Sequence, residues 1–135
     1  LGISQLSRLT SIVEKRREIA AQYDAAFAES GDISPVQSPK HSRGSYHLYV
    51  ARVPASERRR IFDALRAAGI GVNVHYVPVY RHPYYRAHGF ADTALPNADL
   101  LYAECLSLPM FPGLTKADVK RVVSELTGLV ERAAR

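Results

Sequence analysis

The sequence predicts a mixed α/β (α+β) fold in which a small sheet is packed by helices on one face. Long stretches repeat apolar residues every three or four positions, which is typical of amphipathic helices. Short stretches rich in aromatic and β-branched residues lie between turn residues and indicate strands. These patterns alternate along 135 residues, a length that suits one domain with its own core.

The first predicted helix spans residues 3–27, about seven turns. Its apolar stripe consists of Ile3, Leu6, Leu9, Ile12, Val13, Ile19, Tyr23 and Phe27. Ser-Gly at residues 30–31 is a usual end signal. The stripe starts without a capping residue, so we expect the chain to be part of a longer protein. We also expect Leu6, Leu9 and Val13 to present an apolar surface that the small sheet alone does not cover.

The middle of the chain predicts two strands around a helix. Residues 31–44 are rich in proline, glycine and serine and predict a loop, after which residues 46–53 predict a strand. Ser56 is expected to cap the next helix, and Gly69 lies just past its end. A second strand is predicted over residues 71–77.

The C-terminal half predicts two helices and one more strand. Residues 78–95 fit no regular element, and residues 96–105 predict a short helix that Pro96 opens. Residues 106–108 predict a third short strand. Thr-Lys-Ala-Asp at 115–118 resembles a capping box with Asp in the usual Glu place, and a clean amphipathic stripe follows.

Composition limits the classes of function. Eighteen Lys and Arg against thirteen Asp and Glu give a net charge of +5, which suits nucleic acid, an anionic membrane or a phosphorylated small molecule. The basic runs at 15–17 and 58–60 lie in helical patterns whose ordinary interpretation is a solvated face, so we expect no nucleic-acid and no membrane partner. Cys105 is the single cysteine, which excludes a disulfide framework. No apolar run reaches the roughly 18 residues of a membrane span, and we expect a cytoplasmic protein.

Residues 74–86 hold the densest cluster of functional side chains. His75 is expected at the rim of the sheet, where it could donate to a phosphate or a sugar hydroxyl, or transfer a proton. The alternative is a histidine satisfied locally by backbone or tyrosine. Tyr76 and Tyr80 offer flat faces and hydroxyls to a nucleobase or sugar, or close a lid over the core. Arg81 could bind a phosphate with two hydrogen bonds, or be solvated.

Other site chemistries lack their motifs. His75, His82 and His88 could bind zinc, but no carboxylate or cysteine completes a recognisable spacing, so no metal site is expected. The chain contains no G-x-S-x-G nucleophile elbow and no G-x-x-x-x-G-K or G-x-G-x-x-G phosphate loop. A rival interpretation from a different class is a stand-alone basic α/β module that binds nucleotides or nucleic acid through its aromatic and basic loop.

Several blocks of the sequence, in the same order, resemble the C-terminal part of sugar aminotransferases of the DegT/DnrJ/EryC1/StrS family, enzymes that use pyridoxal phosphate. The blocks are GISQL at 2–6, KRREIA at 15–20, SYHLYV at 45–50, AAGIGVNVHYVP at 67–78, PYYR at 83–86 and LSLPMFPGLT at 106–115. The Val-His-Tyr-x-Pro-Val pattern at 74–79 resembles the branch that transfers an amino group to carbon four of UDP-linked 4-keto sugars. At residues 80–82 the sequence departs from that branch, reading Tyr-Arg-His in place of His-Leu-Gln.

The resemblance implies a fold-type-I aminotransferase whose large domain lies outside this chain and holds the pyridoxal phosphate. Residues 1–30 would form a long connecting helix, and residues 31–135 a small C-terminal domain with a short, mostly antiparallel sheet. No catalytic or cofactor-binding residue is implied within this chain, because the lysine that binds the cofactor belongs to the large domain. The substrate-binding residues implied here are His75, Tyr76, Tyr80, Arg81 and His82.

The same resemblance implies a reaction and its partners. The whole enzyme would pass an amino group from glutamate to a nucleotide-linked keto sugar, as a homodimer with active sites shared between subunits, and His75 would face cofactor and substrate. The chain alone is expected to be inactive, because a lysine that attacks pyridoxal phosphate must be desolvated or lie beside other cations. The patterns around the chain's four lysines predict exposed side chains instead: Lys15, Lys40, Lys116 and Lys120. The many arginines and alanines indicate a bacterial source with GC-rich DNA.

Overall fold

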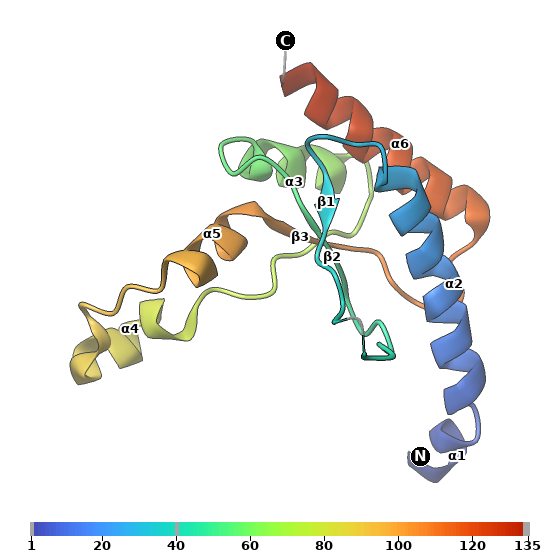
Figure 1. Cartoon of the computed structure of the whole chain (residues 1–135), viewed down its shortest axis with the longest axis horizontal. Coiled ribbons are helices and arrows are strands. Elements are labelled where there is room, and N and C mark those ends of the chain that lie inside the picture. The colour runs from blue at the N-terminus through green and yellow to red at the C-terminus, as the bar shows by residue number, and fades with distance from the viewer. Residues whose placement is uncertain (1, 40, 134–135) are drawn as a thin grey trace.

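The structure is a computed structural model that describes residues 2–39 and 41–133 (Figure 1). The helices are α1 (Gly2–Leu6), α2 (Leu9–Phe27), α3 (Arg58–Ala67), α4 (Pro83–Tyr85), α5 (Pro96–Glu104) and α6 (Lys116–Ala133). The strands are β1 (Ser34–Pro35), β2 (Tyr49–Arg52) and β3 (Cys105–Leu108). Two short helical turns, η1 (Val79–Arg81) and η2 (Arg86–Phe90), lie on either side of α4.

The three strands form an antiparallel sheet in the order β1-β2-β3. Tyr49 lies opposite Leu108, and Ala51 lies opposite Leu106. Because side chains alternate along a strand, these four residues face the same side of the sheet, and all four are buried. The predicted mixed fold with a short antiparallel sheet is confirmed.

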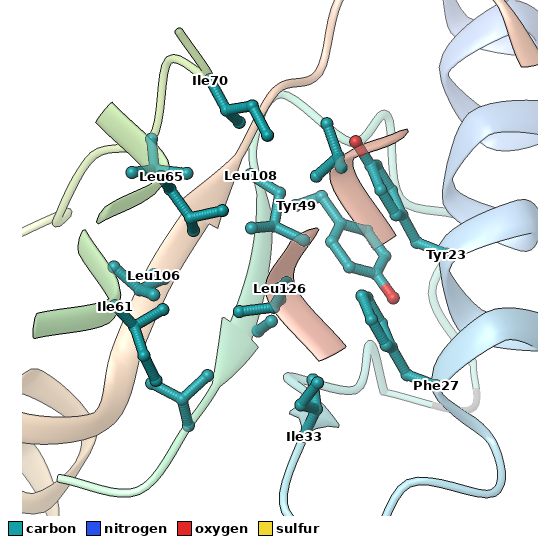
Figure 2. Packing of buried hydrophobic residues seen from close by; sticks show 14 of the residues in the cluster. Tyr23, Phe27, Ile33, Tyr49, Ile61, Leu65, Ile70, Leu106, Leu108 and Leu126 are labelled. Atoms are coloured by element: carbon teal, nitrogen blue, oxygen red, sulfur yellow. The ribbon is translucent and has the colours of Figure 1, made fainter. Parts of the chain in front are cut away.

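Helices α2, α3 and α6 pack over this face of the sheet and complete the core. Figure 2 shows Tyr23 of α2 beside Tyr49, with their ring centroids 4.8 Å apart. On the other side of the core, Leu65 of α3 lies near Leu106, and Leu126 of α6 lies between the two groups. Burying a large apolar side chain contributes about 1.5–3 kcal/mol, so this cluster is the main source of stability.

The predicted helix over residues 3–27 is two helices, because the backbone is interrupted at residues 7 and 8. The Ser7 hydroxyl donates to the Ser4 carbonyl at 2.9 Å, and the Arg8 amide donates to the Gln5 carbonyl at 3.0 Å. A serine hydroxyl that bonds back to the preceding turn competes with the helical ladder. The spacing of the apolar residues does not reveal this competing hydrogen bond, so the sequence predicted one continuous helix.

The apolar stripe of the first two helices is buried only in its second half. Ile3, Leu6 and Leu9 are 88%, 67% and 50% exposed, whereas burial begins at Ile19. Val13 is half-buried. The expected exposed apolar surface is therefore confirmed at Leu6 and Leu9 and is only partial at Val13.

The strand predicted over residues 71–77 is wrong. This segment makes one antiparallel bridge, in which the Asn73 amide donates to the Ser107 carbonyl at 3.1 Å and the Ser107 amide donates to the Asn73 carbonyl at 2.8 Å. Beyond it, the Val74 amide bonds to the side-chain oxygen of Asn73 at 3.1 Å, and Pro78 has no amide hydrogen. The ladder therefore stops after one bridge.

Two strand boundaries in the N-terminal half also differ from the prediction. The strand expected over residues 46–53 is shortened to β2, because Tyr46 adopts a left-handed backbone conformation with φ of 49°. The loop expected over residues 31–44 contains β1, in which Pro35 pairs with Ala51. A proline is tolerated there because β1 is an edge strand.

The two ends of α3 behave differently from each other. Ser56 does not cap the helix, because the amides of Glu57 and Arg58 already bond to the Pro54 carbonyl in a preceding turn, at 2.9 and 3.0 Å. At the other end, Gly69 adopts φ of 75°, as its predicted role as a helix stop requires.

The C-terminal elements agree with the sequence. The predicted helix over 96–105 and strand over 106–108 are α5 and β3, and the capping box precedes α6. The Thr115 amide and hydroxyl donate to the Asp118 carboxylate at 2.9 and 2.6 Å, and the Asp118 amide donates to the Thr115 hydroxyl at 3.1 Å. These bonds from Thr115 lower the pKa of Asp118.

Candidate functional site

His75 lies where the chain leaves its bridge to β3. Its Nδ1 is 2.8 Å from the Ser107 Oγ, and its ring packs edge-on against the Tyr76 ring with centroids 4.6 Å apart. The side chain is half-buried. One ring nitrogen of His75 thus has a hydrogen-bond partner within the chain, as one of the two interpretations of the sequence expected. That partner is a serine, rather than backbone or tyrosine.

A hollow of about 440 Å³ opens beside His75. It lies between β3 with its following loop, the turn after α3 and the first turns of α6. Its polar lining comes from His47, Asn73, His75, Ser107, Asp118 and Arg121. Phe111 and Met110 contribute apolar surface. Mixed lining and a volume within the range of roughly 300–1,000 Å³ typical of small-molecule sites make this hollow the best candidate for a binding site.

The other predicted site residues lie toward an arm that projects from the body of the molecule (Figure 1). Residues 78–95, expected to be irregular, form η1, α4 and η2, and the arm returns through α5. All residues from 81 to 90 are exposed. Their rings stack on one another: Tyr84 on His88 at 4.2 Å and Tyr85 against Phe90 at 6.0 Å between centroids. Local aromatic and proline-initiated turns, rather than burial in the core, give this segment its short helices.

Tyr80 and Arg81 converge on one carboxylate oxygen at the base of the arm. The Tyr80 hydroxyl donates to Oδ1 of Asp99, and an Arg81 Nη2 lies 2.6 Å from the same oxygen. Partial desolvation and the bond to Asp99 raise the pKa of Tyr80. The guanidinium groups of Arg81 and Arg58 lie 5.6 and 5.5 Å from the Tyr102 ring centroid. An anionic ligand would therefore compete with Asp99 for Arg81.

The structure does not gather the five predicted residues into one cluster. Tyr76 lies beside His75 and is 71% exposed, while Tyr80 and Arg81 form a separate pair. His82 lies exposed at the start of α4. A ligand that contacts all five must be elongated and lie along the face between the hollow and the arm.

Sequence reasoning missed two residues that shape this site. Ser107 carries a usable signal, because it is the single polar residue in the strand Cys-Leu-Ser-Leu and is only 4% exposed. Arg121 carries no such signal. It lies on an exposed position of α6, and its guanidinium donates to the Ala68 carbonyl at 2.5 Å.

The described lysines do not fit a covalent pyridoxal phosphate site. Lys15 has a 59% exposed side chain and pairs with Glu18 at 3.1 Å. Lys116 and Lys120 are exposed on α6. A lysine that attacks the cofactor needs desolvation or neighbouring cations, whereas these three side chains are exposed to solvent and Lys15 faces a carboxylate. Lys40 lies outside the described residues.

Neither a metal cluster nor a membrane-spanning helix is found in the part of the chain that the structure describes. Across residues 2–39 and 41–133, no group of three or more His, Cys, Asp or Glu side chains is placed to hold a metal ion. None of the helices described above has both the length and the apolar character needed to cross a membrane.

The sequence is similar to known aminotransferases over nearly its whole length. The model of the DegT/DnrJ/EryC1/StrS aminotransferase family matches residues 1–127. The spore coat polysaccharide biosynthesis protein SpsC of Bacillus subtilis is 36% identical over 140 residues, covering 98% of this chain and 36% of SpsC. A Campylobacter jejuni UDP-4-amino-4,6-dideoxy-N-acetyl-beta-L-altrosamine transaminase is 34% identical, covering 100% of this chain and 36% of the transaminase. The chain thus spans about a third of the length of these relatives.

Solved structures share the fold. Spr1654 of Streptococcus pneumoniae, whose name describes a sugar aminotransferase, has been solved in its PLP form. It superposes with a TM-score of 0.90 at 32% identity, covering 97% of this chain and 34% of Spr1654. The likeness extends over nearly all of the present chain.

Proposed function

Because this chain belongs to the DegT/DnrJ/EryC1/StrS aminotransferase family, we propose that the whole protein transfers an amino group from glutamate to a nucleotide-linked keto sugar. The observation that carries the proposal is His75, which lies in the Val-His-Tyr-x-Pro-Val pattern and lines the 440 Å³ hollow. The Campylobacter jejuni relative, named as a transaminase of a UDP-linked amino sugar, supports the substrate class.

The same proposal assigns separate roles to this chain and to the large domain. Pyridoxal phosphate, when bound, supplies an electron sink for the transfer, and the large domain outside this chain holds it. Residues 1–30 connect to that domain, and residues 31–135 form the small domain. The poor fit of Lys15, Lys116 and Lys120 to the cofactor supports its absence from this chain. The share of this chain is to order the sugar nucleotide and exclude water.

The substrate would lie along the face that runs from the hollow to the arm. His75 donates to a sugar hydroxyl or a phosphate oxygen at the hollow, and the exposed Tyr76 ring packs beside the same group. Tyr80, Arg81 and His82 meet the nucleotide end, with the Arg81 guanidinium toward the diphosphate. A sugar nucleotide is elongated and anionic, which suits both the spread of these residues and the net charge of +5.

We further propose that the whole protein is a homodimer of the bacterial cytoplasm. The exposed apolar side chains of α1 and the start of α2 offer a surface that association or a further domain would cover. The relatives compared above come from bacteria. Cys105 is buried and unpaired, which suits a reducing compartment.

The test is a substitution in the complete enzyme. His75→Ala should lower turnover of a UDP-linked 4-keto sugar with glutamate, while the free energy of unfolding changes by no more than about 1 kcal/mol, because His75 is outside the packed core. His41→Ala, at an exposed position away from the hollow, is the matched control and should leave turnover unchanged. Unaltered turnover with a collapsed melting temperature would show that His75 is structural. Steeply salt-dependent binding to single-stranded nucleic acid would instead favour the stand-alone basic module.

A further inference from the structure

We propose that Ser107 is a positioning residue that holds the His75 ring with its hydrogen on Nε2. His75 then presents a hydrogen-bond donor to the substrate and cannot accept a proton there. This inference rests on the proposed function for the ligand it names, whereas the state of the ring can be measured without any substrate.

Ser107 has an unusual place for a hydroxyl. It lies in β3 between Leu106 and Leu108, and it is the one buried polar residue within the described ranges 2–39 and 41–133, only 4% exposed at the edge of the hollow. A buried hydroxyl is costly unless it is hydrogen-bonded. Its partner is the Nδ1 of His75, 2.8 Å away.

The same serine also fixes the backbone that carries His75. Its amide and carbonyl form both hydrogen bonds of the bridge to Asn73, at 2.8 and 3.1 Å. The His75 segment is thus attached to the sheet at three points of a single residue, two through the backbone and one through the ring. This arrangement sets both the place and the rotation of the imidazole.

The direction of the hydrogen bond follows from counting donors. A serine hydroxyl has one hydrogen, and across the residues that the structure describes its oxygen has no other partner than His75 Nδ1. If Nδ1–H donated to Oγ, the hydroxyl hydrogen would have no acceptor among the described residues, which is unfavourable for a residue that is only 4% exposed. The hydroxyl therefore donates, Nδ1 accepts, and the neutral ring carries its hydrogen on Nε2.

This state decides what His75 can do at the hollow. Nδ1 is occupied by Ser107, and Nε2 is a donor on the far side of the ring. Such a ring suits an acceptor oxygen of a phosphate or a sugar hydroxyl. Proton abstraction during the transfer then belongs to a group other than His75.

Nitrogen NMR of the ring tests the proposal on the complete protein, in which the His75 signals are identified by their absence from His75→Ala. With ¹⁵N-labelled histidine, recorded at an alkaline pH where imidazole rings are neutral, we expect the His75 signals of hydrogen on Nε2 alone. Ser107→Ala keeps the backbone bridge and should move these signals toward the tautomer mixture of an unconstrained imidazole, and Ser107→Thr should restore them. Ser124→Ala, a serine exposed on α6, is the matched control and should change nothing. Hydrogen found on Nδ1 in the unaltered chain, or unmoved signals in Ser107→Ala, would overturn the proposal.

Kinetics of the complete enzyme give the second readout. Ser107→Ala should lower kcat/KM for the nucleotide sugar by about 3- to 10-fold, the effect of one hydrogen bond, mainly through KM. The loss should vanish when His75 is already alanine, because the two residues act as one unit. An equal loss in both backgrounds would overturn the positioning role. An enzyme inactive on every nucleotide sugar would refute the proposed function alone, since the ring signals still decide the tautomer.

Discussion

The packed body of this molecule and its arm, residues 78–104, are stabilised by different kinds of contact. In the body, the sheet and helices α2, α3 and α6 share one core whose large side chains, such as Tyr23 and Leu106, are completely buried. In the arm, residues 81–90 are all exposed, and their rings pack only on neighbours close in the chain. Stability therefore resides in the body, while most of the candidate substrate contacts lie at its edge and along the arm.

The largest effect separates the two regions by stability. Leu106→Ala leaves a cavity beneath α3 and should lower the free energy of unfolding by about 2–5 kcal/mol. Leu100→Ala in the arm is the matched control, because that side chain is 49% exposed, and should stay within about 0.5 kcal/mol. Urea denaturation of both variants measures the contrast. Equal losses would mean that the arm is part of the cooperative core.

A smaller effect sharpens the description of the arm's base. Asp99→Asn removes the charge shared by Tyr80 and Arg81, so amide hydrogen exchange in η1 should quicken while β2 and β3 keep their protection. The pKa of Tyr80 should fall toward its usual value, because the carboxylate of Asp99 is one cause of its rise. NMR on ¹³C-labelled tyrosine follows this titration. An unchanged Tyr80 pKa would show that desolvation alone sets it.

The hydrogen bonds between Thr115 and Asp118 at the start of α6 predict a pH dependence of stability. Hydrogen bonds from Thr115 lower the folded-state pKa of Asp118, so its contribution to stability is complete above the ordinary Asp pKa of about 3.9. It is lost as the pH falls through the lower folded value. Denaturation between pH 5 and 2, as an order-of-magnitude window, should show a weaker acid dependence in Asp118→Asn than in the unaltered chain. Parallel pH profiles would contradict this role.

The last prediction is that pyridoxal phosphate does not bind covalently to this chain. The 135-residue chain, titrated with pyridoxal phosphate, should not develop the saturating, stoichiometric absorbance band that accompanies covalent binding by a lysine, because Lys15, Lys116 and Lys120 are solvent-exposed. A band that saturates at one equivalent and disappears with one lysine substitution would contradict the proposal that the cofactor lies outside this chain.

Local signals predicted most of the body. The capping box at Thr115, the glycine stop at Gly69 and the stripe of α6 each depend on neighbouring residues, and each is confirmed. The strand over residues 71–77 failed because an asparagine side chain took the Val74 amide. The residue pattern over 71–77 is the same whether the segment forms one bridge or a full ladder of hydrogen bonds.

The sequence predicted the candidate site only within the segment that contains His75, and not the residues that contact it from elsewhere in the chain. The sequence predicted His75 at the rim of the sheet through a strand that does not form; the structure places it just after the single bridge to β3, where it lines the hollow. Its partner Ser107 lies 32 residues further along the chain, and Asp99 lies 19 residues after its partner Tyr80. Contacts of this kind depend on how the elements pack, which periodicity and motifs do not encode.

The most direct test of the central claim follows the nitrogen atom. The complete protein, supplied with pyridoxal phosphate, a UDP-linked 4-keto sugar and ¹⁵N-glutamate, should yield an amino sugar nucleotide that carries the ¹⁵N label, detected by mass spectrometry. His75→Ala should lower the rate at which the label is transferred. Absence of label from the sugar with every nucleotide-linked keto sugar tried would contradict the claim that this chain is the substrate-ordering part of a sugar-nucleotide aminotransferase.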